Sequence, residues 1–143
     1  MDYLIKAEIR NPRARIFTFR AHKTMYGGRR IAVGDTVFIF SSENEGGPGL
    51  IARGVVTASE PTPRKRGVAR QTPRVSVVVK RTKLAKRRLG RTEMRPFNAW
   101  RDCRPETELN FKFYRQATSK IVGISDPTAA FLERFFSRGS AAK

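Results

Sequence analysis

The sequence contains one cysteine, Cys103, and one histidine, His22, in 143 residues. A lone cysteine excludes an intramolecular disulfide and leaves a thiolate zinc site without its other ligands. A lone imidazole gives little from which to build a Ser-His-Asp or metal constellation, and we interpret His22 as a surface or loop residue. No Gly-x-Ser-x-Gly elbow surrounds Ser41-Ser42, and no Gly-Lys-Ser/Thr follows residues 44–47. The sequence therefore predicts neither an enzyme nor a protein that holds a metal or a cofactor.

Long apolar runs are also missing, because no segment approaches the ~20 residues that span a bilayer. The opening text MDYLIKAEIRNP lacks the basic segment and apolar core of a secretion signal. The single cysteine suits a reducing compartment. We therefore expect a soluble, cytoplasmic protein.

Acidic residues are scarce: 12 Asp and Glu stand against 30 Lys and Arg, which gives a formal net charge of +18. A field of this size concentrates phosphate polymers before any specific contact forms. The charge therefore favours a nucleic-acid partner, with an acidic membrane or an acidic protein as the alternatives.

The cations concentrate between residues 61 and 91, a tract without an acidic residue. A run of charge is ordinarily a solvated surface. Twelve cations without a counter-charge repel one another unless a polyanion lies against them, so we predict that the tract binds phosphates. The predicted phosphate-binding residues are Arg64, Lys65, Arg66, Arg70, Arg74, Lys80, Arg81, Lys83, Lys86, Arg87, Arg88 and Arg91.

Apolar patterning predicts four strands, with clear alternation in residues 2–10 and 74–82 and apolar residues on both faces of 36–41, as in a central strand. Residues 2–10 place Tyr3 and Ile5 toward a core and Lys6 toward solvent. Residues 36–41 and 50–59 predict a hairpin that turns at residues 46–49. Residues 74–82 predict a further strand, after an exposed loop at 61–72.

Other segments carry weaker patterns. Residues 13–30 could hold a short helix, residues 83–91 a turn of helix or a loop, and residues 107–117 an extended or mixed segment. The clearest helix follows Ser125, a favourable N-cap residue. We expect one domain over residues 1–138, with a tail at 139–143.

Exposed aromatic rings would be needed to hold unpaired bases, because stacking contributes ~1–3 kcal/mol per base. Most of the ten phenylalanines must instead form the core. Trp100 and Tyr114 are better candidates because each lies beside an arginine.

Four stretches together resemble the EVE domain, which belongs to the PUA-like group with the ASCH and YTH domains. Residues 3–8, YLIKAE, resemble the first EVE strand, Y-W-L-x-K-S-E-P. Residues 34–42, GDTVFIFSS, resemble the strand G-D-x-V-x-x-Y-H-S, and residues 48–56, PGLIARGVV, are similar to its partner P-G-I-x-G-x-x-x-V. Residues 13–25 match R-N-x-x-A-R-N loosely. The chain departs from these patterns at Leu4, Ala7, Ile9 and Ser41.

The resemblance implies an α+β fold, a PUA-like mixed β pseudo-barrel with flanking helices. It also implies a pocket for a modified or extruded base in DNA or RNA beside the first strand and Ser41-Ser42. Polar residues at the end of that strand can offer hydrogen bonds to a base edge; the alternative is that they form an exposed hairpin loop. The expected base-pocket residues are Lys6, Ala7, Asn11, Ser41, Ser42, Asn44, Trp100 and Tyr114.

Two function classes follow from the sequence. The first is a nucleic-acid-binding module without enzymatic activity. Its partner would be DNA or RNA, and we do not expect it to bind a membrane. The second is an accessory protein that docks its basic tract on an acidic protein or a ribonucleoprotein.

Overall fold

A barrel of six strands forms the centre of the molecule. The computed structural model describes residues 2–68, 71–114 and 119–137, except for the side chain of Tyr114. The strands close in the order β1-β3-β4-β5-β2-β6. β1–β3 and β2–β6 are parallel pairs and the other neighbours are antiparallel, so the barrel is mixed. The strands are β1 (Asp2–Ala7), β2 (Ile16–Met25), β3 (Thr36–Ser41), β4 (Gly49–Pro61), β5 (Arg74–Leu84) and β6 (Lys120–Ile124).

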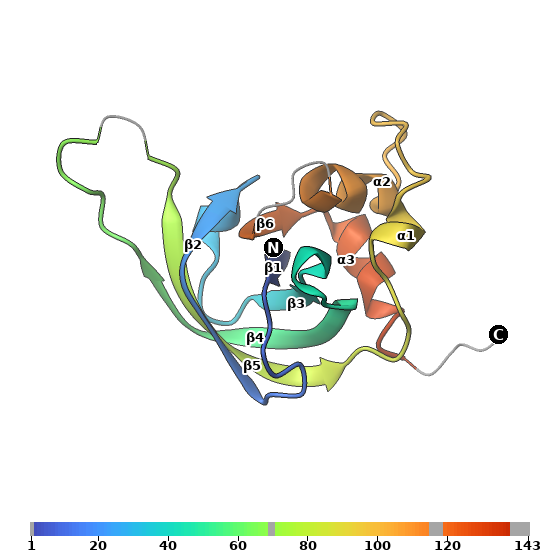
Figure 1. The fold of residues 1–143 in the computed structure, drawn as a ribbon, viewed down its shortest axis with the longest axis horizontal. Helices are drawn as coiled ribbons and strands as arrows, with labels where there is room; N and C mark the ends of the chain where they lie inside the picture. The colour runs from blue at the N-terminus through green and yellow to red at the C-terminus, as the bar shows by residue number, and fades with distance from the viewer. Residues whose placement is uncertain (1, 69–70, 115–118, 138–143) are drawn as a thin grey trace.

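Short helices pack against one side of this barrel, while the connection between β4 and β5 projects from the other side (Figure 1). The α-helices are α1 (Arg91–Met94), α2 (Pro105–Leu109) and α3 (Asp126–Glu133). The π-helix η3 (Asn110–Tyr114) continues directly from α2, and the 3-10 helices η1 (Gly28–Arg30) and η2 (Glu43–Glu45) precede α1 in the chain. This architecture confirms the predicted α+β fold with a mixed β-barrel and flanking helices.

Two apolar clusters stabilise the fold, one on each face of the sheet. The inner cluster takes residues from all six strands, among them Tyr3 and Ile5 of β1. The outer cluster lies between the barrel wall and the helices and includes Leu4 of β1, Phe113 of η3 and Leu132 of α3. Alternate residues of β1 therefore enter different cores, because successive side chains of a strand point to opposite faces.

Several sequence predictions are confirmed. The hairpin is formed by β3 and β4, and the strand predicted at 74–82 lies within β5, where Val75, Val77 and Val79 are buried. The Oγ of Ser125 accepts a hydrogen bond from the amide of Thr128, which caps α3.

The short helix expected within residues 13–30 is wrong, because most of this segment forms β2. Phe17 and Phe19 enter the inner cluster with the period of a strand, and the pairing of Phe19 with Val77 fixes β2 beside β5. The register shifts between Phe19 and His22, where Ala21 adopts a φ of 49°. This bulge interrupts the alternation of apolar residues and hides the strand in the sequence.

The extended segment expected at residues 107–117 is also wrong, because α2 and η3 occupy its described part. The expectation that Lys6 faces solvent is wrong as well. Its face of β1 is covered by η3 rather than by water, and Lys6 is only 1% exposed. A pattern of alternation separates the two faces of a strand but does not show that one of them is wet.

Candidate nucleic-acid interface

The two serines at the end of β3 are buried, with exposed fractions of 4% and 5%. The amide of Ser42 donates a hydrogen bond to the carbonyl oxygen of Ala7 at 2.8 Å, which joins the ends of β3 and β1. The amide of Gly47 donates to the carbonyl oxygen of Ser42 at 2.8 Å, and a Cβ on Gly47 would lie 2.7 Å from the carbonyl carbon of Ser41. The turn after β3 therefore packs against the serines, so the exposed-loop interpretation does not hold for them.

Lys6 lies beside this strand end and contacts Phe113 of the outer apolar cluster. Its Nζ donates a hydrogen bond to the carbonyl oxygen of Phe113 at 3.3 Å. The residue opposite Lys6 on β3 is Phe40, whose ring contacts that of Phe113 at 4.9 Å between centroids. Burial lowers the pKa of Lys6, the nearby charge of Arg91 lowers it further, and Glu43 acts in the opposite direction.

Lys120 is the residue opposite Lys6 on β6, and it too is only 1% exposed. Burial together with the charges of Lys6 and Lys23 lowers its pKa to about 8. Two adjacent buried ammonium groups thus concentrate positive charge at the end of β1. The sequence offered no sign of this, because positions 6 and 120 are brought together only by strand pairing.

Asn44 and Arg91 meet at the open side of the same region. The amide of Arg91 donates to Oε1 of Glu43 at 2.7 Å, and Nη2 of Arg91 donates to Oδ1 of Asn44 at 3.1 Å. Asn44 itself is exposed. The structure therefore brings together one predicted phosphate-binding residue and one predicted base-pocket residue.

The other predicted base-pocket residues lie elsewhere or are not described. Asn11 is exposed in the β1–β2 connection, where it lines a cavity of about 500 Å³ with Ala7. Trp100 is 45% exposed between α1 and α2, and its ring contacts Phe111 at 5.6 Å. Trp100 and Phe111 line a separate cavity of about 420 Å³. The backbone of Tyr114 ends η3, and its side chain lies outside the described part of the structure.

The basic tract is divided between the two ends of β5 rather than gathered in one patch. Residues 61–68 and 71–74 lie at the start of this strand, and residues 83–91 pass beside α3 at its other end (Figure 1). Arg70 lies outside the described residues. Acceptors within the protein already engage several arginines of the tract, among them Arg74, Arg81, Arg87, Arg88 and Arg91.

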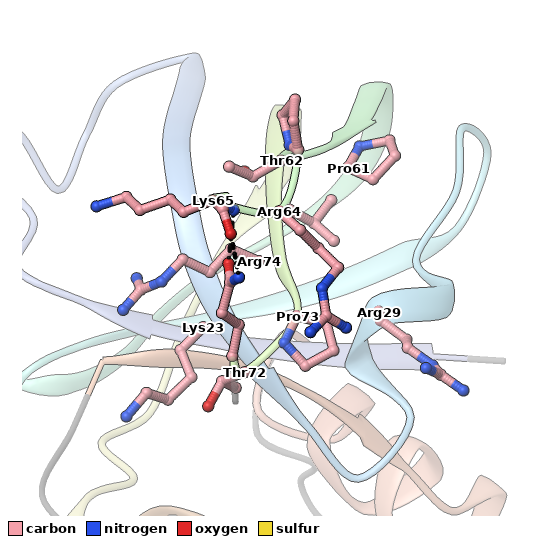
Figure 2. Close-up of a pocket in the computed structure, with 12 residues that line it drawn as sticks. Lys23, Arg29, Pro61, Thr62, Arg64, Lys65, Thr72, Pro73 and Arg74 are labelled. Carbon is pink, nitrogen blue, oxygen red and sulfur yellow. Dashed lines mark hydrogen bonds between the residues drawn. The ribbon is translucent and has the colours of Figure 1, made fainter. Parts of the chain in front are cut away.

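A cavity of about 590 Å³ lies where the β4–β5 connection meets β2 and η1. Five cations line it: Lys23, Arg29, Arg64, Lys65 and Arg74. Figure 2 shows the charged ends of Lys23, Lys65 and Arg74 on one side of the view and those of Arg64 and Arg29 toward the other. Among its described lining residues there is no carboxylate, and the undescribed residues of the chain contain no Asp or Glu.

Hydrogen bonds hold the walls of this cavity in place. The amide of Thr62 donates to the carbonyl oxygen of Arg74 at 2.8 Å, which closes the base of the β4–β5 connection. The amide and hydroxyl of Thr24 both donate to the carbonyl oxygen of Pro73, at 3.0 and 2.7 Å. The amide of Lys65 donates to the Gln71 side chain at 2.8 Å (Figure 2). The cations of the cavity are thus carried on an ordered frame.

Sequence reasoning missed two of the five cations, Lys23 and Arg29. Lys23 stands on the strand that was expected to be helical, and Arg29 follows the Gly27-Gly28 pair that ends it. The pairing of Lys23 with Arg74 could be inferred only once β2 was placed beside β5.

His22 is not the surface or loop residue that the sequence predicted. It stands on β2, its ring lies 5.4 Å from that of Phe19, and its Nε2 is buried without a hydrogen-bond partner among the described residues. Burial lowers the pKa of His22, and the charge of Arg74 lowers it further. The imidazole is therefore neutral at pH 7.

The described part of the chain contains no group of three or more His, Cys, Asp or Glu side chains placed to hold a metal ion. Its helices are all too short to cross a bilayer.

The molecule is a closed mixed β-barrel with helices on one side and a cation-lined cavity on the other. Several solved structures share this fold. The DUF55 domain of human thymocyte nuclear protein 1 aligns at a TM-score of 0.62 and 14% identity, over 92% of this chain and 95% of that one. Human THYN1 protein in complex with 5-methylcytosine-containing DNA aligns at 0.62 and 14%, over 96% and 98%. A protein from Pseudomonas putida aligns at 0.60 and 15%, over 96% and 100%.

These likenesses show the fold, because the identities are low while the alignments span almost the whole of both chains. The mixed β-barrel with flanking helices that the sequence resemblance implies is therefore confirmed as the fold. No family model matches the chain, and no curated protein matches it in sequence.

Proposed function

We propose that the protein is a nucleic-acid-binding module that holds the phosphate backbone on its cationic surface and receives a modified or extruded base near the ends of β1 and β3. The observation that carries the proposal is the cavity beneath the β4–β5 connection, where five cations meet without a carboxylate among the described lining residues. Such a concentration of like charge attracts a polyanion and gains from releasing its counterions.

The partner class is supported from two further directions. The net charge of +18 favours phosphate polymers over neutral ligands. A protein of the same fold, human THYN1, binds DNA that contains 5-methylcytosine. Together they favour a nucleic acid over an acidic protein. The absence of a nucleophile–base pair in the sequence leads us to propose binding without catalysis.

The proposed base pocket rests on donors and acceptors at the ends of β1 and β3. Asn44 offers an exposed amide, which can pair with a base edge, and Arg91 beside it offers a guanidinium. Lys6, Ser41 and Ser42 lie behind them in the wall, where they add positive potential and buried polar groups. Ala7 lies at the end of β1 beside this pocket, whereas Asn11 and Trp100 line two other cavities and the side chain of Tyr114 is outside the described part, so these three would contact the strand outside the pocket.

Oligonucleotide binding tests this function directly. We expect the chain to bind single-stranded or duplex oligonucleotides at low salt, with an affinity that falls steeply as salt rises. The triple variant Arg64→Ala, Lys65→Ala, Arg66→Ala should weaken binding by a similar factor for every sequence. On duplex DNA the slope of log affinity against log salt concentration (the salt slope) should be smaller in magnitude for this variant. The decrease should be about 0.9 for each phosphate that the three side chains no longer neutralise.

The single variant Ser42→Ala should instead reduce preference for an oligonucleotide with 5-methylcytosine over its unmodified counterpart. Reversed effects, with the triple variant changing base preference and Ser42→Ala changing only bulk affinity, would show that the two roles have been assigned to the wrong residues. Absence of any oligonucleotide binding at low salt, together with a stoichiometric acidic protein in the purified material, would replace this function with the docking alternative.

A further inference from the structure

Four cations stand in line across four neighbouring strands of the barrel. Lys6 of β1 is opposite Lys120 of β6, and Lys23 of β2 is opposite Arg74 of β5. The two pairs are joined by the parallel pairing of β2 with β6, in which Thr24 stands opposite Ile121. The residues one position earlier on these two strands are Lys23 and Lys120, so the row runs without interruption.

All four side chains belong to the outer face of the barrel. Ile5, Ile121 and Val75, each adjacent in sequence to a member of the row, enter the inner cluster, which sends Lys6, Lys120 and Arg74 outward. Lys23 shares its face of β2 with Met25, which packs against the outer cluster. At one end of the row the lysines are buried, and at the other end Arg74 is exposed and lines the 590 Å³ cavity with Lys23.

A row of this kind opposes the stability of the sheet. Like charges directly opposite each other on neighbouring strands destabilise the pairing, and here Lys6 with Lys120 and Lys23 with Arg74 are two such pairs, while Lys23 and Lys120 each precede a residue of the β2–β6 pairing. The pKa of Lys120 records the same repulsion, because Lys6 and Lys23 both lower it. Lys23 and Arg74, the accessible half of the row, line the 590 Å³ cavity without a carboxylate among its described lining residues, so an anion bound there would relieve their repulsion.

We propose that this row is the track for the sugar-phosphate backbone of a single nucleic-acid strand, running from the cavity beneath the β4–β5 connection toward the end of β1. Phosphates contact Lys23 and Arg74 directly, while Lys6 and Lys120 strengthen the field from within the wall. Strands of a sheet lie about 4.8 Å apart, so the row extends over roughly 14 Å, enough for consecutive phosphates rather than one ion. This inference rests on the proposed nucleic-acid binding and specifies where the strand lies.

The track also makes binding depend on proton uptake. The charged groups near its buried end are Lys6 and Lys23, which lower the pKa of Lys120, and Arg91 and Glu43, which act on Lys6. A phosphate beside Lys23 favours the charged form of Lys120, so the bound state holds more protons than the free state above pH 8. Affinity is therefore full below pH 8 and falls as pH rises above it.

The first test compares two double variants that remove the same charge. Lys23→Ala with Arg74→Ala removes the accessible half of the row, whereas Lys80→Ala with Lys83→Ala removes two exposed cations from the rest of β5. With a fluorescent 12-nucleotide single-stranded DNA that contains one 5-methylcytosine, we expect the first pair to bind at least tenfold more weakly than the second. Its salt slope should fall by about 1.4, which corresponds to two phosphate contacts on a single strand.

The second test uses the pH dependence of the same titration. Affinity of the unaltered protein should fall roughly tenfold between pH 7 and 9.5, and Lys120→Arg should remove most of that fall because its guanidinium stays charged. Lys120→Met should bind more weakly at pH 7 and also lose the pH dependence. Circular dichroism of each variant shows that it is folded.

The outcomes separate this inference from the proposed function. Equal reductions of affinity in the two double variants, with the unaltered protein binding normally, would overturn the track alone. An unchanged pH profile in Lys120→Arg would also contradict it. If the unaltered protein failed to bind DNA or RNA at low salt, the proposed function and the track would both be wrong.

Discussion

Lys120 gives the most exacting test of the electrostatics, because its ammonium is buried between two other cations. Its pKa of about 8 lies below the ordinary value of 10.5, and each pH unit of difference corresponds to about 1.4 kcal/mol. Below pH 8 the folded protein therefore holds this charge at a cost of about 3 kcal/mol. Replacement by methionine, which is apolar and of similar length, should raise the free energy of unfolding at pH 7 by about 2–3 kcal/mol.

The sign of the pH dependence follows from the same pKa. Between pH 8 and 10.5 the unfolded chain binds a proton at this position that the folded chain does not, so stability rises with pH across that window. The advantage of Lys120→Met should accordingly shrink toward zero as pH approaches 10.5. Lys120→Arg is the matched control: it stays charged throughout and should gain no stability from this position over the same range.

Urea unfolding followed by circular dichroism at pH 7 and pH 9.5 measures both effects. At pH 7 the methionine variant should also melt roughly 5–10 °C higher than the unaltered protein. A methionine variant that is less stable than the unaltered protein at pH 7 would refute the reasoning, since it would mean that the buried ammonium makes contacts worth more than its desolvation and repulsion.

The remaining predictions concern packing and capping. Gly28→Ala places a Cβ 2.7 Å from the carbonyl carbon of Ile121 and in overlap with its oxygen, so it should cost about 1–3 kcal/mol of stability; thermal melts in which Gly28→Ala is neutral would contradict the packing argument. Ser125→Ala should cost about 1–2 kcal/mol of stability because it removes the N-cap of α3 and a hydrogen bond to Glu108. Ser125→Asn should restore part of the cap. Thermal melts in which Ser125→Ala is neutral would show that α3 does not depend on its cap.

The retention of Lys120 has a functional meaning if these stability effects are observed. Proteins keep destabilising polar groups chiefly where a ligand needs them, since most other positions tolerate a more stable residue. A methionine variant that is more stable and binds DNA less well would place Lys120 in this category. The cost to the fold would then be part of how the binding surface is prepared.

Local pattern was enough to predict the elements that repeat regularly. The alternation in β1 and β5, the apolar run of β3 and the capping serine before α3 depend on neighbours along the chain, and these predictions are confirmed. β2 was missed because its bulge at Ala21 breaks the period of two. The helices α2 and η3 were missed because their apolar residues, such as Leu109 and Phe113, serve the outer cluster without a long amphipathic stripe.

The binding surface was only partly accessible to the same reasoning. The tract at 61–91 marked the chain as basic, and its members Arg64, Lys65 and Arg74 do line the cavity. Their companion Lys23 comes from β2, and the tract itself is divided by the length of β5. Clustering along the sequence is therefore a poor guide to clustering in space when a long strand lies between the charges, because each residue of a strand advances the chain by about 3.3 Å.

The sequence by itself determined the sign and size of the charge, the strands with regular alternation, and the resemblance of residues 2–60 to the EVE pattern. These properties depend on composition and on neighbours in the chain. Only the tertiary structure decided which cations meet. Lys6 stands opposite Lys120, and Lys23 stands opposite Arg74, because barrel closure pairs strands that are distant in sequence. Closure also covers the outer face of β1 with η3, which turns Lys6 from an expected surface residue into a buried charge.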